Sequence, residues 1–245
     1  MKVMIVGGGG REHAILEELR ENPRIEKLYC LPGNGGMAAH AECVPIKATD
    51  IDGIVRFAAE KAIDFAVIGP DDPLIAGVCD RLRTNGVRCF GPSKAAAAIE
   101  GSKSFAKNLM RKYGIPTADY AVFDRATEAY AYLAGANYPV VIKADGPALG
   151  KGVIIADNPP EAFQAVRAMM EEGVFGVSGS RVVVEEFLTG VEASVLAFTD
   201  GTTLIPMISA LDHKRALDGD KGLNTGGMGA LAPIPPVLKI GRAHV

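Results

Sequence analysis

The sequence predicts an α/β fold in which a domain built on a parallel sheet is followed by a domain of mixed α+β type. Short apolar runs alternate with amphipathic stretches from Met1 to about Pro92, and strand-like runs lie closer together after that point. Such alternation is typical of a parallel sheet covered by helices on both faces. The chain has 245 residues, of which 48% are hydrophobic and 22% charged, a globular balance that argues against disorder or a coiled coil.

The N-terminal elements follow from this alternation. Apolar runs are predicted as strands and the amphipathic stretches between them as helices. The strands are Lys2–Val6, Lys27–Leu31, Asp64–Gly69 and Val87–Gly91, and the helices are Glu12–Arg20, Asp52–Lys61 and Leu74–Asn85. Gly91-Pro92-Ser93 interrupts the pattern, and Ser93 is expected to cap an alanine-rich helix. A domain boundary is therefore expected near this point.

The later part of the chain is richer in strands that can pair antiparallel. A helix over Ser102–Tyr113 is expected to end at Gly114-Ile115-Pro116. After it we expect helices over Ala126–Ala134 and Pro160–Glu171, and strands over Tyr120–Phe123, Pro139–Ala144, Val153–Ala156, Arg181–Phe187, Glu192–Phe198 and Thr202–Met207. Regular periodicity disappears from Ser209 to Pro236, and so long an irregular stretch is typically functional or disordered.

Charge, hydropathy and cysteine content limit the classes of function. The 26 basic and 29 acidic residues give a net charge of −3, whereas nucleic-acid binding usually requires a clustered basic face, so no nucleic-acid partner is expected. No apolar run approaches the roughly 20 residues of a membrane span, which predicts a soluble, cytoplasmic protein without a membrane partner. The four cysteines lack a CxxC pair or zinc-site spacing and are expected to be free thiols: Cys30, Cys43, Cys79 and Cys89.

The first glycine cluster, Gly7–Gly10, follows a strand and opens a helix. Free backbone N–H groups and the helix dipole attract phosphate at such a place. The spacing does not fit the dinucleotide fingerprint GxGxxG, because the sixth position is Glu12 when counted from Gly7 and His13 when counted from Gly8. The cluster therefore indicates an anion site, and its structural alternative is a tight turn that packs strand against helix.

The second cluster, Lys143–Gly152, lies between two strands of an expected hairpin. It contains Lys143, Lys151 and three glycines, but it lacks the order GxxxxGK[ST] and no helix is expected to begin after it. A loop of this kind can close over nucleotide phosphates with its lysines as point charges. The alternative is a glycine-rich hairpin with exposed lysines.

Two further segments complete the candidate site. In Glu185–Ser194 a strand, a short connection and a strand leave the backbone of residues 186–188 free to contact an adenine edge, although acids at strand ends are often merely solvated. The segment Asp212–Gly229 combines charges of both signs with an Asn-Thr pair. That composition suits a loop that holds a small polar substrate against a phosphate. His213 is assigned no catalytic role.

Six runs together resemble one family. They are Val6–Ala14, Pro32–Gly36, Gly69–Gly77, Gly91–Lys107, Tyr138–Val153 and Asp212–Gly229. In this order they resemble the phosphoribosylamine–glycine ligases, or glycinamide ribonucleotide synthetases, which are ATP-grasp enzymes of purine biosynthesis. The resemblance implies a Rossmann-like N-terminal domain and an ATP-grasp domain in a monomer. It further implies the ligation of glycine to 5-phosphoribosylamine with ATP and Mg²⁺ or Mn²⁺, through glycyl phosphate.

The resemblance also implies three groups of site residues. Those expected to bind ATP are Lys107, Lys143, Gly150, Lys151, Gly152, Glu186, Phe187, Leu188 and Glu192. Those expected to face the ribosylamine are Gly9, Gly10, Asn34, Gly35 and Asp71. Those expected at the glycine and the transferred phosphate, as the catalytic group, are Asp212, Lys214, Arg215, Asn224 and Gly226. No metal ligand is expected within the chain, because the family's metal-binding Glu and Asn have no counterpart in it.

The domain plan implied by the resemblance has five parts. Residues 1–100 form the substrate-binding domain, 101–120 linker helices, 121–191 the ATP-grasp lid, and 192–239 an incomplete larger ATP-grasp subdomain. Residues 240–245 also match a translated sequencing adapter and are expected to be an artefact of an incomplete gene fragment. Without metal ligands, such a fragment is expected to be inactive as a ligase.

Departures from the family and alternative functions accompany this interpretation. Pro147 and Leu149 differ from the family's loop, and Val191 and Leu223 from its later runs, without removing an expected phosphate ligand.

One alternative function is that of another ATP-grasp carboxylate ligase, such as a biotin-dependent carboxylase subunit. The PGNGG and NTGGMG runs argue against it. The other is a nucleotide-binding module without turnover.

Overall fold

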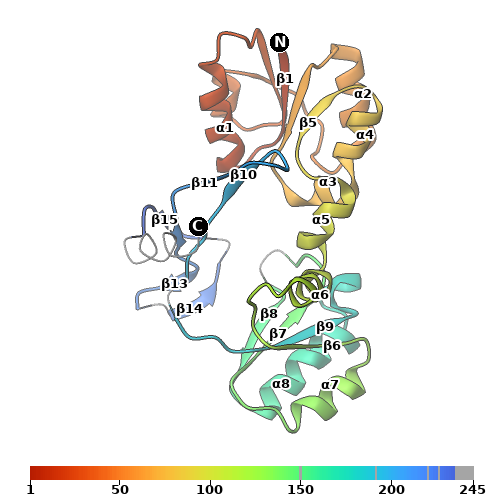
Figure 1. The fold of residues 1–245 in the computed structure, drawn as a ribbon, viewed down its shortest axis with the longest axis vertical. Helices are drawn as coiled ribbons and strands as arrows, with labels where there is room; N and C mark the ends of the chain where they lie inside the picture. Colours follow the sequence, from red (N-terminus) through yellow and green to blue (C-terminus); the bar gives the residue numbers. More distant parts are fainter. Residues whose placement is uncertain (149–150, 191, 220, 226, 235–245) are drawn as a thin grey trace. The chain divides into compact units, whose positions relative to one another are not determined.

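The computed structural model describes the chain except for residues 149–150, 191, 220, 226 and 235–245 (Figure 1). It divides the chain into two compact units, unit 1 (Met1–Gly114) and unit 2 (Ile115–Val245). Among the helices described, none combines the length and apolarity that a membrane crossing requires.

Unit 1 is built on a five-stranded parallel sheet of order β3-β2-β1-β4-β5 (Figure 1). Its strands are β1 (Lys2–Gly7), β2 (Lys27–Pro32), β3 (Glu42–Cys43), β4 (Phe65–Ile68) and β5 (Arg88–Phe90). The connections contain α1 (Gly10–Arg20), the 3₁₀ turn η1 (Met37–Ala39), α2 (Ile51–Lys61), α3 (Asp71–Ala76) and α4 (Val78–Thr84). The unit ends with α5 (Lys94–Gly101) and α6 (Lys103–Tyr113).

The central strand β1 divides the core of unit 1 into two halves. Met4 and Val6 belong to one buried cluster, together with residues of α2 and α4. Val3 and Ile5 belong to another, together with Leu16 of α1. Because successive side chains of a strand point to opposite faces, both faces of the sheet are covered. The parallel sheet and its Rossmann-like arrangement are thus confirmed.

The structure corrects two element predictions in unit 1. The single helix predicted over Leu74–Asn85 is wrong, because Gly77 adopts a left-handed conformation (φ +95°) and separates α3 from α4. β3 is missing from the predictions, since two residues are too few to show a period. Ser93 caps α5 and Ser102 caps α6, each by accepting a backbone N–H, so the expected start of both helices is confirmed.

Unit 2 begins with a four-stranded antiparallel sheet of order β6-β9-β7-β8. Its strands are β6 (Tyr120–Phe123), β7 (Val140–Ala144), β8 (Val153–Ala156) and β9 (Val182–Glu186). Helices α7 (Ala126–Leu133) and α8 (Pro159–Val166) cover one face, on which Ile142 and Val184 are buried (Figure 1). The helix predicted to Glu171 changes at Arg167 to a π-helical turn (Arg167–Glu171), and a 3₁₀ turn (Gly176–Gly179) precedes β9.

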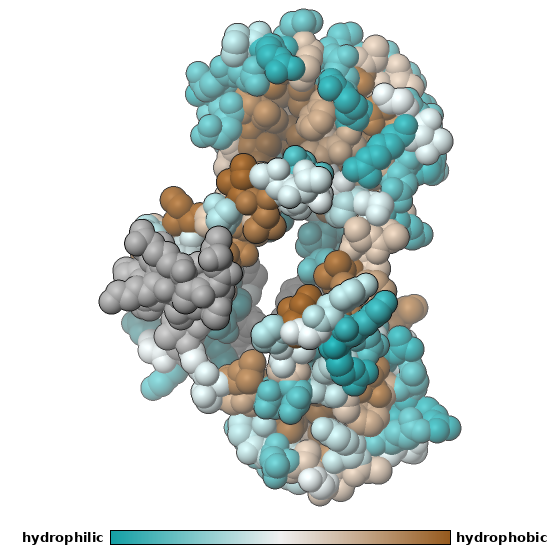
Figure 2. Space-filling view, in the orientation of Figure 1, coloured by the Kyte–Doolittle hydropathy of each residue, from teal (hydrophilic) through white to brown (hydrophobic). Residues whose placement is uncertain are grey.

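The remainder of unit 2 consists of short antiparallel pairs. β10 (Ala197–Thr199) pairs with β11 (Leu204–Pro206), β12 (Leu211–Asp212) with β15 (Ala230–Leu231), and β13 (Arg215–Leu217) with β14 (Lys221–Asn224). Every residue of β10 and β11 is exposed. Figure 2 shows apolar side chains on this two-stranded hairpin, the β10–β11 hairpin.

Two predictions in this region are corrected. The strand predicted over Glu192–Phe198 is shorter, since Ser194 makes only an isolated bridge with Ala210. The expectation of no regular structure from residue 209 onward is wrong for the described residues, because pairs of two to four residues are too short for a periodic pattern.

Candidate functional site

Three loops of unit 1 meet at the carboxyl end of the parallel strands. They are Gly7–Gly10 after β1, the loop after β2 that carries Asn34, and Gly69–Asp71 after β4. The N–H of Gly33 donates to the carbonyl of Gly7 at 3.2 Å. A Cβ atom on Gly8 would lie 2.4 Å from the carbonyl oxygen of Gly33, so only glycine permits this close approach.

Glu12 fills the space between two of these loops. Its side chain is 6% exposed, and its Oε2 accepts the N–H of Gly9 at 2.6 Å. A Cβ atom on Gly69 would lie 2.1 Å from Oε1 of Glu12, so Gly69 must be a glycine for the carboxylate to fit. Glu12 is absent from the predicted site residues. The sequence feature that could have identified Glu12 is a glutamate three residues after a helix N-cap, which is the capping-box position.

Asn34, predicted to face the ribosylamine, uses most of its side-chain hydrogen bonds inside the protein. Its Nδ2 donates to the carbonyl of Gly8 at 2.9 Å, and its Oδ1 accepts the N–H groups of Gly36 and Met37 at 2.9 and 3.0 Å. One amide N–H then remains for another acceptor. Asn34 therefore orders the second loop and ties it to the first.

The other residues of this group lie on the same edge and face solvent. Gly9, Gly10, Gly35 and Asp71 are exposed. A Cβ atom on Gly10 or Gly35 would meet nothing within 4 Å, so their backbone is open to a ligand. Arg11 adds a cation at this edge, where its Nη1 donates to the carbonyl of Gly69 at 3.4 Å. The arrangement can bind an anion through backbone N–H groups at the start of α1.

In unit 2, Lys143 and Glu185 form an ion pair between adjacent strands. Nζ of Lys143 lies 3.0 Å from Oε2 of Glu185, and the side chains are 27% and 6% exposed. The register places Val141 opposite Glu185 and Lys143 opposite Val183, so both side chains lie on the face away from α7 and α8. Glu185 is not among the predicted site residues, although strand alternation places it on the same face as Lys143.

The glycine loop between β7 and β8 closes the hairpin predicted there. The N–H of Ala144 donates to the carbonyl of Gly152 at 2.8 Å, and the N–H of Lys151 to that of Ala148 at 2.9 Å. Gly152 is buried, and a Cβ atom on it would lie 2.5 Å from the Cβ of Ala148. Lys151 is exposed, whereas Gly150 lies outside the described residues. β8 follows the loop directly, so this is not a P-loop that opens a helix.

The connection after β9 presents the residues predicted for adenine. Glu186 ends the strand, and its Oε1 accepts the N–H of Asp119 at 2.9 Å. Its own N–H donates to the carbonyl of Asp119 at 2.9 Å. Phe187 and Leu188 are 38% and 64% exposed. The side chain of Glu186 thus fixes the connection, and its N–H, expected to be free, is already bound to Asp119.

Residues predicted for ribose and for glycine come together in unit 2. Lys214 forms an ion pair with Glu192, and its Nζ lies 3.8 Å from Oδ1 of Asp212. The hydrogen bond to Glu192 raises the pKa of Lys214. Nη1 of Arg215 donates to the carbonyl of Gly222 at 2.9 Å, and the backbone of Asn224 pairs with Arg215. Gly226 lies outside the described residues.

The remaining predicted ligand, Lys107, lies in unit 1. It is 7% exposed on α6. For metals, the described part of the chain contains no group of three or more His, Cys, Asp or Glu residues that could hold an ion.

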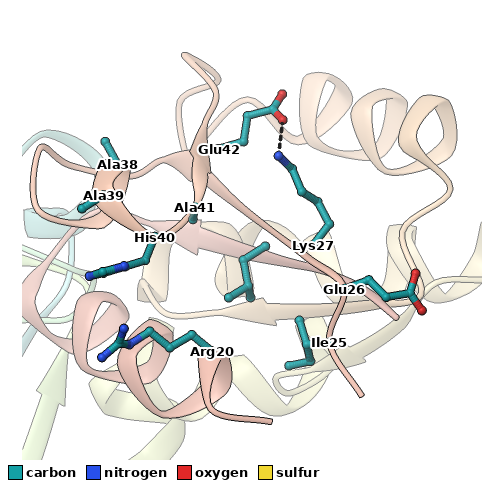
Figure 3. Close-up of a pocket in the computed structure, with 10 residues that line it drawn as sticks. Arg20, Ile25, Glu26, Lys27, Ala38, Ala39, His40, Ala41 and Glu42 are labelled. Carbon is teal, nitrogen blue, oxygen red and sulfur yellow. Dashed lines mark ion pairs between the residues drawn. The ribbon is translucent and has the colours of Figure 1, made fainter. Parts of the chain in front are cut away.

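A separate pocket of about 430 Å³ lies in unit 1 (Figure 3). It opens at the amino end of β2, whereas the three loops gather at the carboxyl ends of the strands. Lys27 and Glu42 point toward each other at its rim, with Nζ 2.9 Å from Oε2, and this hydrogen bond raises the pKa of Lys27. None of the predicted site residues lines this pocket, which is bordered by Arg20, Ile25, Glu26, Lys27, Leu28, Ala38, Ala39, His40, Ala41 and Glu42.

Comparison with known proteins gives matches over both units. Residues 1–100 match the family model described as phosphoribosylglycinamide synthetase, N domain, and residues 101–241 match that described as phosphoribosylglycinamide synthetase, ATP-grasp (A) domain. Curated relatives named phosphoribosylamine–glycine ligase are 52% identical in Brucella melitensis and 51% in Halalkalibacterium halodurans. Each alignment covers 96% of this chain and 55% of the relative. The chain therefore spans little more than half the length of these relatives.

Solved structures agree with these matches. The crystal structure of the phosphoribosylamine–glycine ligase from Thermotoga maritima aligns with a TM-score of 0.82 at 35% identity, covering 99% of this chain and 59% of that chain. The biotin carboxylase domain of 2-oxoglutarate carboxylase from Hydrogenobacter thermophilus aligns with a TM-score of 0.70 at 18% identity, covering 85% of this chain and 49% of that chain. The second likeness concerns the fold alone.

Proposed function

This chain belongs to the phosphoribosylglycinamide synthetase family, and from that premise we propose that its protein is a phosphoribosylamine–glycine ligase. The proposed reaction joins glycine to 5-phosphoribosylamine and converts ATP to ADP and phosphate. The observation that carries the proposal is the match of two consecutive domain models of one synthetase, in chain order, over residues 1–241.

The ATP-binding role falls to unit 2 and Lys107. Lys143 would place its ammonium group against the phosphates, held in position by Glu185, and Lys151 would contribute a second charge from the glycine loop with Gly150 and Gly152. The backbone of Glu186, Phe187 and Leu188 would contact adenine, and Glu192 the ribose. A bound Mg²⁺ or Mn²⁺ would neutralise phosphate charge. We assign it no ligand in the described residues, which contain no suitable acidic cluster.

The substrate roles are divided between the units. In unit 1 the edge formed by Gly9, Gly10, Asn34, Gly35 and Asp71 would bind the phosphate and sugar of the ribosylamine, with backbone N–H groups as donors. The catalytic group would be Asp212, Lys214, Arg215, Asn224 and Gly226.

The proposed chemistry has two steps. The carboxylate of glycine attacks the γ-phosphate to give glycyl phosphate, and the ribosylamine nitrogen then displaces phosphate. Lys214 and Arg215 would stabilise the charge that moves onto the phosphate oxygens, so catalysis consists mainly of positioning and charge neutralisation. We place the full-length enzyme in the cytoplasm as a monomer without nucleic-acid or membrane partners.

The test is the substrate dependence of ADP release. The full-length product of the gene that carries this sequence should release ADP only when glycine and 5-phosphoribosylamine are both present. This chain by itself should bind ATP without releasing ADP. ADP release that depends on bicarbonate and not on glycine would overturn the proposal in favour of a carboxylase-type ligase.

A further inference from the structure

Two cysteines of unit 1 lie in direct contact. Cys79 is on α4 and Cys89 on β5, and the thiol of Cys89 donates a hydrogen bond to Sγ of Cys79 at 3.0 Å. Cys79 is completely buried. Cys89 is half-buried on β5, the last strand of the sheet, so a small reagent can approach it from the sheet edge. The thiol of Cys89 is therefore accessible, and the buried thiol of Cys79 is in contact with it.

The backbone around the pair holds the two sulfur atoms together. Arg83, on α4, donates to the carbonyl of Cys89 at 3.2 Å and to that of Gly91 at 2.7 Å. These bonds fasten the end of β5 to the helix. Since a disulfide bond is about 2.05 Å long, the sulfur atoms need to approach by only about 1 Å.

The electrostatics of the pair favour a nucleophile at the buried position. The hydrogen bond from Cys89 lowers the pKa of Cys79, and the charge of Arg83 acts in the same direction. The same hydrogen bond and burial raise the pKa of Cys89. A thiolate is the form that attacks an oxidised sulfur.

We propose that Cys79 and Cys89 form an oxidation site at which a peroxide converts the two thiols into an intramolecular disulfide. The Cys79 thiolate accepts the proton of Cys89 along their hydrogen bond, and the Cys89 thiolate so formed attacks hydrogen peroxide. An S–O bond forms and the O–O bond breaks, and the hydroxide that leaves takes the proton from Cys79 as water, so that Cys89 becomes a sulfenic acid. The Cys79 thiolate then attacks that sulfur. The S–S bond forms, the S–O bond breaks, and the hydroxide that leaves takes a proton from the solvent to become a second water. The two thiols lose two electrons in total, and the peroxide accepts them.

The same chain contains a comparison pair. Cys30 and Cys43 occupy paired positions on the neighbouring parallel strands β2 and β3. The thiol of Cys43 donates instead to the carbonyl of Asn34 at 3.7 Å. Burial raises the pKa of Cys30 to about 12. The Cys30–Cys43 pair should therefore stay reduced under treatment that oxidises the proposed site.

The experiment treats this chain with hydrogen peroxide, blocks remaining thiols with iodoacetamide and maps tryptic peptides without reduction. Arg81, Arg83 and Arg88 lie between the two cysteines, so trypsin separates them unless a disulfide joins their peptides. We expect two of the four thiols to be lost and the Cys79 and Cys89 peptides to be recovered as one cross-linked species. Dithiothreitol should separate them again.

Matched variants of the two half-buried cysteines keep the result interpretable. Cys43→Ser should still form the cross-link, whereas Cys89→Ser should retain all three of its thiols at the same peroxide dose. The proposal is overturned if four thiols survive in the wild type, if the cross-link joins Cys30 to Cys43, or if oxidation yields only dimers between chains. This outcome does not depend on ligase activity.

Discussion

At the scale of single residues, both candidate sites depend on a buried carboxylate. Glu12 accepts the N–H of Gly9 and packs against Gly69, while Glu185 pairs with Lys143. A buried acid without partners is costly, and here each is paired with a donor from the loop or strand that it positions. Each of these two buried carboxylates thus holds a residue of a candidate site, Gly9 in unit 1 and Lys143 in unit 2.

Replacing Glu12 tests its structural role. Glu12→Ala leaves the N–H of Gly9 without its acceptor and opens space beside Gly69, so the free energy of unfolding of unit 1 should fall by about 1–3 kcal/mol. Urea denaturation followed by circular dichroism measures this change. Glu18→Ala, an exposed position on the same helix, should change stability by about 0.5 kcal/mol or less. Equal effects of the two substitutions would contradict the role given to Glu12.

Replacing Lys143 tests the nucleotide site. Lys143→Met should weaken binding of a fluorescent ATP analogue at least about tenfold, which corresponds to about 1.4 kcal/mol, because a charge next to the phosphates is lost. The single variant also removes the ammonium group that forms the ion pair with the buried carboxylate of Glu185. The double variant Lys143→Met, Glu185→Gln should recover stability but not affinity. Lys112→Met, an exposed lysine, serves as the control, and unchanged affinity in Lys143→Met would refute the assignment.

At the scale of elements, short polar contacts decide where helices and turns begin and end. Gly77 divides the region of α3 and α4, Asn158 caps α8 through the N–H of Glu161, and Asp200 organises the turn from β10 to β11. In that turn the carboxylate of Asp200 accepts the N–H groups of Thr203 and Thr202 and the hydroxyl of Thr202. Such side-chain contacts add to the short backbone ladder where strands are only three residues long.

The pH dependence of the β10–β11 turn follows from Asp200. The hydrogen bonds from the backbone of Thr203 and Thr202 lower its pKa to about 2, below the unfolded value of about 3.9. The carboxylate therefore stabilises the turn at pH values above the pKa of the unfolded chain. This contribution is lost as the pH falls through about 2. Carboxyl carbon chemical shifts should give a midpoint near 2 for Asp200. A midpoint near 3.9 would show that the turn is not formed in solution.

At the scale of the whole molecule, the chain consists of two units with separate cores. The clusters on the two faces of the parallel sheet lie within residues 1–114, and the cluster between the antiparallel sheet and its helices lies within unit 2. A core of its own is what allows a domain to fold independently.

Independent folding of unit 1 can be tested directly. A polypeptide of residues 1–114 should unfold in one cooperative thermal transition, because the buried clusters on both faces of its sheet remain complete. Circular dichroism and calorimetry measure this transition. A broad, non-cooperative melt would mean that unit 1 depends on the rest of the chain.

The exposed β10–β11 hairpin of unit 2 leads to a second prediction, which concerns self-association of the chain. Phe198, Leu204 and Ile205 are 53%, 68% and 61% exposed. Apolar patches of this kind favour association, so sedimentation velocity should show self-association that grows with concentration. Replacing Phe198 and Ile205 by Ser should reduce it. A wild-type chain that stays monomeric at every concentration tested would contradict this expectation.

The sequence by itself determined the parallel and antiparallel sheets, the glycine loops and the family, because apolar periods, caps and glycine clusters act over a few residues. Only the tertiary structure showed that Glu12 packs against Gly69, that Glu185 lies beside Lys143 from 42 positions away, and that Cys79 contacts Cys89. These contacts join different elements, so strand order and register decide them. Local patterns predict a hairpin between consecutive strands, but they do not determine which strands far apart in the sequence become neighbours, and the packing of each core decides this.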